Sequence, residues 1–195
     1  MNYAELKTNI ASWIHRSDLT ALIPIFIDMA RSRICHDLES MHIEKRYSDT
    51  LASEYTALPT DLIDIRSLKI NNKKINYWTE DQIVQNGFNS ATGVEAIYTI
   101  VANQLRIIGA PDSAELEIVY RYIPASMSLD ADQDVILANY PQLYIYGSQL
   151  EYLNWSENED RATKVVNYYR DAINQINTAS NKAKYPSGAL SVRSC

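Results

Sequence analysis

The stretch HIEKRYSDT, residues 42–50, marks the point at which the hydrophobic period of the sequence changes. Ile43 and Tyr47 lie on the same side of an extended chain, and polar residues fill most of the positions around them. Alternation with a period of two is typical of a β-strand, and β-branched and aromatic residues become frequent from here on. A β-rich region is therefore predicted to begin at this stretch.

Upstream of this stretch, apolar residues recur at helical spacing. The first stripe consists of Leu6, Ile10, Trp13 and Ile14. Ser17 and Asp18 end that helix, and Pro24 fits the first turn of the next one, where its missing N–H costs no hydrogen bond. The second stripe consists of Ile27, Ala30, Ile34 and Leu38. Two helices are therefore expected within residues 3–38.

Downstream, turn signals separate short extended segments. Residues 69–75 predict a hairpin, because Asn71 and Asn72 tolerate the positive φ of a two-residue turn. Thr79 and Gln82 have the spacing of a capping box for a short helix that Gly87 ends. Further strands are predicted at 96–101, 105–108 and 115–123, with turns at 103–104 and 109–112.

After Pro124 the helical period returns. Residues 132–139 predict one short helix, and Pro141 opens a longer one. The stripe of that longer helix consists of Leu143, Tyr146, Gly147, Leu150, and Leu153 or Tyr152. An acidic turn at 157–160 suits the start of a last helix. Its stripe consists of Ala162, Val165, Val166, Tyr169, Ile173 and Ile176.

The order of helices, strands and helices predicts an α+β fold. The helices at the two ends of the chain each need a partner for their apolar stripes, and each other is the nearest one. We expect a helical bundle built from residues 1–40 and 131–180, with a β-rich insertion at 41–130. Residues 181–195 lose all periodicity and carry basic residues without an acid, so an extended C-terminal tail is expected there.

Composition excludes several classes of protein. The chain has 195 residues and a net charge of −6, which argues against a protein that holds nucleic acid by summed charge. Cys35 and Cys195 cannot form a disulfide framework, so reduced thiols are expected. The longest apolar run, residues 21–27, is far too short to span a bilayer, and the N-terminus has no basic segment of a secretory signal. These features predict a globular protein made in a cytoplasm, without a membrane partner.

Enzyme signatures are missing from the sequence. Its glycines form no phosphate-binding loop, and no nucleophile elbow or HExxH metal motif occurs. Asp130, Asp132 and Asp134 begin like a calcium loop, but Val135 stands where that loop needs glycine and Pro141 where it needs a glutamate. An acidic helix start is the preferred interpretation. No catalytic residue, cofactor or metal is therefore predicted.

The 14 tyrosines stand out more than any catalytic pattern. Those in the closing helices are Tyr140, Tyr144, Tyr146, Tyr152, Tyr168 and Tyr169. Because a phenol combines apolar area with a polar tip, such residues suit either a protein interface or packing inside the bundle, and both interpretations stay open.

Several stretches, in this order and spacing, resemble the head-to-tail adaptor (connector) proteins of tailed bacteriophages. They are IASWIHRSDL (10–19), IPIFIDMARSRI (23–34), LPTDL (58–62), LRIIGAP (105–111), VYRYIP (119–124) and YPQLYIY (140–146). The resemblance covers nearly the whole chain. One departure is that residues 52–54 lack the glycine usual in the turn before Leu58 and Pro59.

The resemblance implies a non-enzymatic virion protein of the neck, made in the host bacterial cytoplasm. It implies a ring of twelve subunits beneath the portal that joins the DNA-filled capsid to a tail nozzle or tail-tube protein. It also implies that the C-terminal segment extends onto the portal protein. The residues expected to make that contact are Lys182, Lys184, Tyr185, Pro186, Leu190, Val192 and Arg193.

A ring of this kind has a central channel through which DNA passes during ejection without specific binding. Every phosphate contact adds affinity and slows passage, so a net negative bore is expected. Asp130, Asp132 and Asp134 are the candidates to line it.

Two other classes of function stay open at this point. The main alternative is a virion-associated peptidoglycan hydrolase with a Glu or Asp general acid. The third is a small helical DNA-binding regulator, for which residues 28–33 are the candidate recognition helix.

Overall fold

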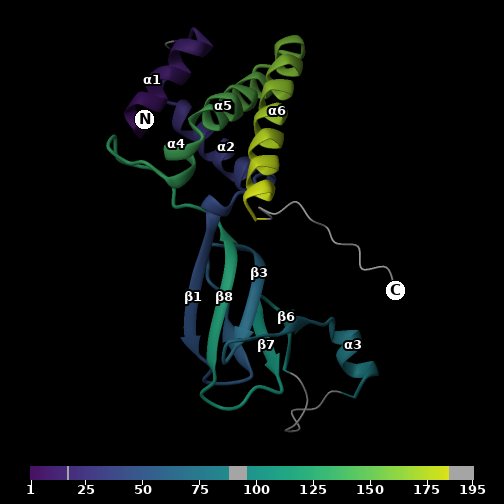
Figure 1. Cartoon of the computed structure of the whole chain (residues 1–195). Helices are drawn as coiled ribbons and strands as arrows, with labels where there is room; N and C mark the ends of the chain where they lie inside the picture. Colours follow the sequence, from purple (N-terminus) through teal and green to yellow (C-terminus); the bar gives the residue numbers. More distant parts are fainter. Residues whose placement is uncertain (17, 88–95, 185–195) are drawn as a thin grey trace. The chain divides into compact units, whose positions relative to one another are not determined.

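The computed structural model describes residues 1–16, 18–87 and 96–184. Helices and strands are both well represented, so the predicted α+β class is confirmed. The chain divides into two compact units (Figure 1). The helical unit contains residues 1–43 and those from 123 onward, and the β unit is the continuous segment Glu44–Tyr122.

The helical unit takes its helices from both ends of the chain. They are α1 (Tyr3–Ile14), α2 (Ile23–Asp37), the short 3-10 helix η1 (Met41–Ile43), α4 (Val135–Asn139), α5 (Pro141–Trp155) and α6 (Glu159–Lys184). Helix α5 packs against α1, α2, α4 and α6. The two ends of the sequence thus share one core.

The helix starts carry the predicted prolines, while two helix bounds differ from the prediction. Asn2 and Glu5 form a reciprocal capping box at the start of α1, and Pro24 and Pro141 lie in the first turns of α2 and α5. Helix α4 is shorter than the predicted 132–139, because Asp134 is its N-cap and accepts from the Leu137 N–H. Helix α6 continues to Lys184, so residues 181–184, expected in the extended tail, are helical.

Helix α5 is buried on more than one face. Leu143, Gly147, Leu150 and Leu153 are buried as the predicted stripe requires, but so are Tyr144, Ser148, Gln149 and Glu151. A Cβ built at Gly147 would lie 3.0 Å from the Ala30 Cβ, so the missing side chain lets α2 and α5 approach closely. Tyr146, and Tyr152 as the predicted alternative to Leu153, are only half-buried. The Tyr146 ring lies against Tyr168 of α6, and the Tyr152 ring lies near Phe26 of α2.

The β unit consists of two four-stranded sheets. Their strands are β1 (Glu44–Thr50), β2 (Tyr55–Ala57), β3 (Leu62–Ile70), β4 (Lys73–Lys74), β5 (Asn76–Tyr77), β6 (Ile97–Val101), β7 (Gln104–Ile108) and β8 (Glu115–Tyr122). One sheet has the order β1-β8-β3-β4 and the other β2-β7-β6-β5. All pairings are antiparallel except β5 with β6. The chain passes between the two sheets after β1, after β2, after β4 and after β7.

The tight turns explain two of these pairings. Asn71 and Asn72 have φ values of 47° and 63°, which confirms the predicted hairpin between β3 and β4. The turn between β6 and β7 is formed by Ala102 and Asn103, both with positive φ, and not by residues 103–104 as predicted, because Gln104 already pairs with Val101. Residues 52–54 have no positive φ, so their turn needs no glycine.

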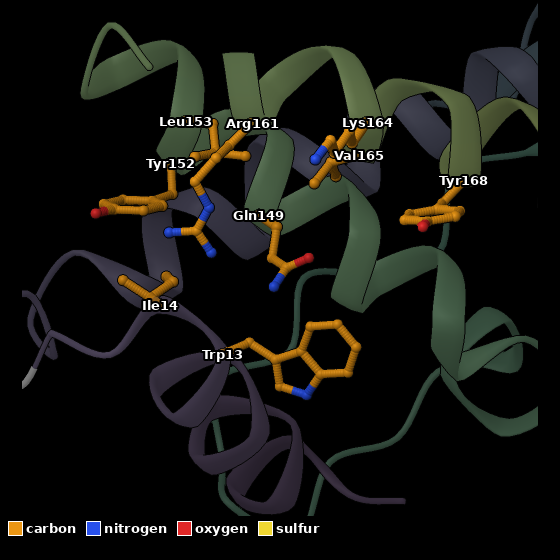
Figure 2. Close-up of a pocket in the computed structure, with 9 residues that line it drawn as sticks. All are labelled: Trp13, Ile14, Gln149, Tyr152, Leu153, Arg161, Lys164, Val165 and Tyr168. Carbon is orange, nitrogen blue, oxygen red and sulfur yellow. The ribbon is translucent and has the colours of Figure 1, made fainter. Parts of the chain in front are cut away.

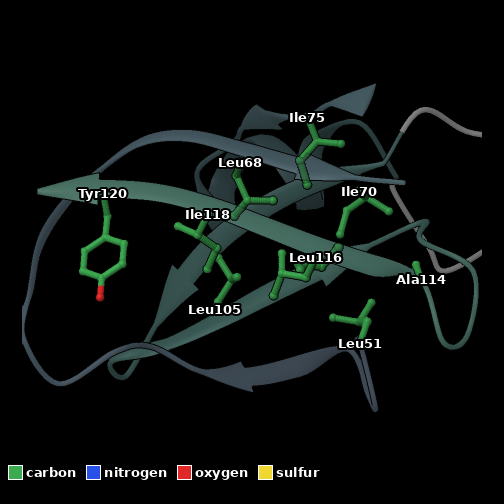
Figure 3. Close-up of a cluster of buried hydrophobic side chains, with 10 residues drawn as sticks. Leu51, Leu68, Ile70, Ile75, Leu105, Ala114, Leu116, Ile118 and Tyr120 are labelled. Atoms are coloured by element: carbon green, nitrogen blue, oxygen red, sulfur yellow. The ribbon is translucent and has the colours of Figure 1, made fainter. Parts of the chain in front are cut away.

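Alternating side chains of both sheets form the core of the β unit (Figure 3). The buried cluster consists of Leu51, Leu68, Ile70, Ile75, Leu105, Ile107, Ala114, Leu116, Ile118 and Tyr120. Strand β8 contributes every second residue from Leu116 to Tyr120, as an amphipathic strand does.

Helix α3 (Glu80–Gln85) belongs to the β unit and begins with the predicted capping box of Thr79 and Gln82. Its Ile83 packs with Ile97 and Ile108. Arg106 of β7 bonds Glu54 at 2.6 Å and Glu80 at 3.2 Å, which joins the helix to the sheet.

Candidate interaction surface

The helical unit exposes several large apolar side chains. Trp13, Ile25, Met29, Trp155 and Tyr168, on α1, α2, α5 and α6, are all about half exposed. Trp13 was predicted in the buried stripe of α1, but it is 49% exposed because Tyr3, Leu6, Ile10 and Ile14 already complete that stripe. Exposed apolar groups of this size are typical of protein interaction surfaces.

Two hollows lie among these side chains. The first, called here the Trp13 hollow, has a volume of about 240 Å³. Its walls come from α1, α5 and α6 (Figure 2) and consist of Trp13, Ile14, Gln149, Tyr152, Leu153, Arg161, Lys164, Val165 and Tyr168. It combines three aromatic rings with two cations and one amide.

The second hollow has a volume of about 370 Å³, and Ile25, Phe26, Met29 and Trp155 give it an apolar wall. An aromatic cluster connects it with the first. The ring centroid of Tyr152 lies 6.1 Å from that of Phe26 and 6.5 Å from that of Trp155. Tyr152 lines the first hollow and Trp155 the second, so the two form one apolar surface at the end of α5.

Polar pairs join the helices of this unit. Glu151, whose side chain is 6% exposed, accepts from Arg33 at 2.6 Å. Tyr169 of α6 donates its hydroxyl to Asp37, the last residue of α2. Burial, with the bond to Asp37, raises the pKa of Tyr169, so the phenol stays protonated as the donor.

The three candidate bore acids lie close together in sequence, and each has a local partner. Asp130 bonds Lys7 Nζ at 2.7 Å, and Asp132 accepts the backbone N–H groups of Leu129 and Ser128, which lower its pKa. Asp134 caps α4 and accepts from the buried Tyr144 hydroxyl. Among the described residues no cluster suited to a metal ion occurs.

The expected portal-binding residues fall at and beyond the end of α6. Lys182 is exposed on that helix, and Lys184 is its last residue. The others, Tyr185, Pro186, Leu190, Val192 and Arg193, lie outside the described residues.

The candidate recognition helix at 28–33 is part of α2, and its arginines serve the fold. Arg31 donates to the Pro124 carbonyl at 2.6 Å and pairs with Asp28, while Arg33 bonds Glu151. Because both arginines bond groups of the helical unit, they are not free to contact DNA bases, and a DNA-binding face on α2 is disfavoured.

Comparison with known families identifies the chain. The family model described as SU10 adaptor protein matches residues 1–193, and so covers both units. The chain belongs to the SU10 adaptor protein family. This is a family of phage head-to-tail adaptors, as the sequence resemblance predicted. No curated protein matches the sequence.

Membership assigns this SU10 adaptor a phage structural role, with association to portal and tail at the virion neck. In the part of the chain that the structure describes, no helix is long and apolar enough to cross a membrane. The sequence did not reveal the Trp13 hollow, since its lining comes from three helices far apart in the chain. Tyr3, Leu6, Ile10 and Ile14 fill the buried face of α1 without Trp13, and this pattern is the sequence signal that could have indicated an exposed Trp13.

Proposed function

We propose that this SU10 adaptor forms a twelve-subunit ring beneath the portal, joins the DNA-filled capsid to the tail, and has no enzymatic activity. The family match over residues 1–193 carries the proposal. The apolar surface around Trp13 and Trp155 supports it, since subunits of a ring associate through exposed surfaces of this kind.

In this proposal the segment after α6 docks on the portal. Lys182 and Lys184, with Arg193, supply positive charge, and Tyr185, Leu190 and Val192 supply apolar side chains. Such a segment fits a cleft with acidic walls between portal subunits.

The bore of the ring is proposed to be net negative, with Asp130, Asp132 and Asp134 as its lining residues. Asp130 has the strongest case, because its side chain is 76% exposed even though it pairs with Lys7. A charge map of the assembled ring tests this point, and a continuous lining of lysine and arginine would exclude it.

Mass measurement separates the adaptor from the peptidoglycan hydrolase. The purified chain is measured alone and with portal protein by native mass spectrometry. A ring that forms on the portal supports the adaptor, while a monomer that cleaves peptidoglycan and ignores the portal contradicts it. The most buried carboxylate described, that of Glu151, is paired with Arg33 and makes a poor general acid.

Removal of residues 185–195 tests the portal contact while leaving α6 whole. The truncated chain keeps both cores, so it is expected to fold but to lose attachment to portal-containing heads. A chain with residues 185–195 in scrambled order is the matched control for length and composition. Attachment of the truncated chain at the wild-type level would assign the contact to the helices instead.

A further inference from the structure

The Gln149 side chain lines the Trp13 hollow and points into it. The residue as a whole is 7% exposed, and its amide faces the open side of the hollow. Figure 2 shows this amide at the centre of the hollow, above the ring of Trp13. An amide offers both a donor and an acceptor, so this group can form hydrogen bonds with a ligand that enters the hollow.

Two cations stand at the same hollow without ion pairs. Arg161 and Lys164 of α6 are exposed, and no described carboxylate pairs with either of them. They lie on the α6 side of the hollow, across from Trp13 (Figure 2). A guanidinium offers a fork of donors that matches a carboxylate, and the ammonium adds a second positive charge.

The remaining walls are apolar. The rings of Trp13, Tyr152 and Tyr168, together with Leu153 and Val165, surround the amide. The volume of about 240 Å³ is small for a cofactor, since ligand sites typically have roughly 300–1,000 Å³, but it suits one large side chain.

We propose that the Trp13 hollow binds a peptide segment of a partner protein that presents a carboxylate next to a large apolar side chain. The apolar side chain enters between the aromatic rings, and the carboxylate pairs with Arg161 and Lys164. The Gln149 amide, which is both donor and acceptor, pairs with a peptide group of the segment.

Charge favours a peptide over a nucleic acid at this site. A nucleic acid brings a row of phosphates, whereas the hollow offers two cations on a chain of net charge −6. A single carboxylate matches those two cations. The proposal uses part of the apolar surface offered above for ring contacts, but its test needs only the isolated chain, whereas the ring is tested with portal protein. The two proposals can therefore fail separately.

The test follows the indole N–H resonance of Trp13 by NMR while the peptide acetyl-Leu-Asp-Tyr-amide is added to the full chain. We expect a saturable shift at Trp13 and none at Trp78, which lies in the β unit. The control peptide acetyl-Leu-Asn-Tyr-amide lacks the charge and is expected to bind about tenfold more weakly or worse.

Variants locate the site. Arg161→Ala with Lys164→Ala, both at exposed positions, leaves the fold intact and weakens peptide binding about tenfold or more. Gln149→Leu weakens binding as well. Arg170→Ala, at an exposed position on the same helix but outside the hollow, is the matched control and keeps wild-type affinity.

Three results would overturn the proposal. They are the absence of a saturable shift at Trp13, equal affinity for the Asp and Asn peptides, and tighter binding of thymidine monophosphate than of the acidic peptide. The last would identify a nucleotide site instead.

Discussion

In the helical unit the residues that pack together come from opposite ends of the chain, whereas in the β unit every strand comes from one continuous segment. Helix α5 contacts α1 and α2 across more than a hundred residues of sequence, and Arg33 bonds Glu151. The β unit spans only Glu44–Tyr122 and closes its own core. The comparison indicates that the β unit forms from its own segment, while the helical unit requires the whole chain.

One ion pair from each unit differs in burial. The Glu151 side chain of the helical unit is 6% exposed and pairs with Arg33, while the side chains of Lys69 and Glu117 in the β unit are 33% and 22% exposed. Loss of the partner leaves a nearly buried charge in the first case and a partly hydrated one in the second. Substitution at the Glu151 pair should therefore cost more stability than substitution at the Lys69 pair.

The largest expected effect comes from cutting the chain. A fragment of residues 44–122 is expected to fold, since its core needs no other segment, and a fragment of residues 1–43 is expected to stay unfolded without α5. NMR spectra of the two fragments are the measurement. We expect well-dispersed amide resonances for residues 44–122 and poorly dispersed ones for residues 1–43. An unfolded 44–122 fragment would break the comparison.

The next effect concerns the buried pair of the helical unit. Arg33→Ala leaves the Glu151 carboxylate buried without its cation and is expected to cost about 3 kcal/mol of unfolding free energy. Lys69→Ala, the matched change in the β unit, is expected to leave stability almost unchanged. Chemical denaturation followed by helical circular dichroism and by the indole N–H resonance of Trp78 reports on the two units. Equal losses for the two variants would contradict the argument.

Substitutions at two glycines compare steric crowding at a helix contact with strain in a left-handed backbone. Gly147→Val forces a side chain against Ala30 between α2 and α5 and is expected to cost about 1–3 kcal/mol. Gly87→Ala has open space but a φ of +63°, so its cost of about 1 kcal/mol comes from the left-handed backbone alone. Thermal unfolding of both variants measures the difference. A Gly147→Val protein as stable as wild type would exclude the close approach.

The smallest effect is a dependence on pH. Burial would raise the pKa of Asp61, but hydrogen bonds from Lys45 and Tyr120 outweigh it and leave that pKa lowered. A lowered folded-state pKa gives stability that is present above the unfolded value of about 3.9 and lost as the pH falls through the folded value. Asp61→Asn is expected to flatten this acid dependence in the β unit only, as denaturation between pH 6 and pH 2 would show.

Burial and the bond to Asp61 raise the pKa of Tyr120 to about 12, so the tyrosine stays a donor throughout that range. Asp132 of the helical unit, whose pKa is lowered by backbone N–H groups, is the control for Asp61. If Asp61→Asn changed the pH dependence of the stability of the helical unit, the two units would not unfold independently in acid.

The sequence by itself determined the features that depend on neighbours along the chain. The capping box of Thr79 and Gln82, the turn at Asn71 and Asn72 and the prolines that open α2 and α5 were all predicted. The change of period at residues 42–50 predicted the α+β class, and the order of short stretches predicted the family. These signals are local because hydrogen bonds between residues a few positions apart, or fixed backbone angles, produce them.

Only the tertiary structure decided which face of each element is covered. Trp13 and Ile14 are adjacent in sequence, yet one is exposed and the other buried, since α5 covers only one side of α1. The strand order β1-β8-β3-β4 and the close approach at Gly147 likewise depend on partners far along the chain. The place of Gln149 in the Trp13 hollow depends on tertiary structure in the same way. A helical pattern predicts which face of a helix carries a residue, but it does not predict the hollow that three helices form around it.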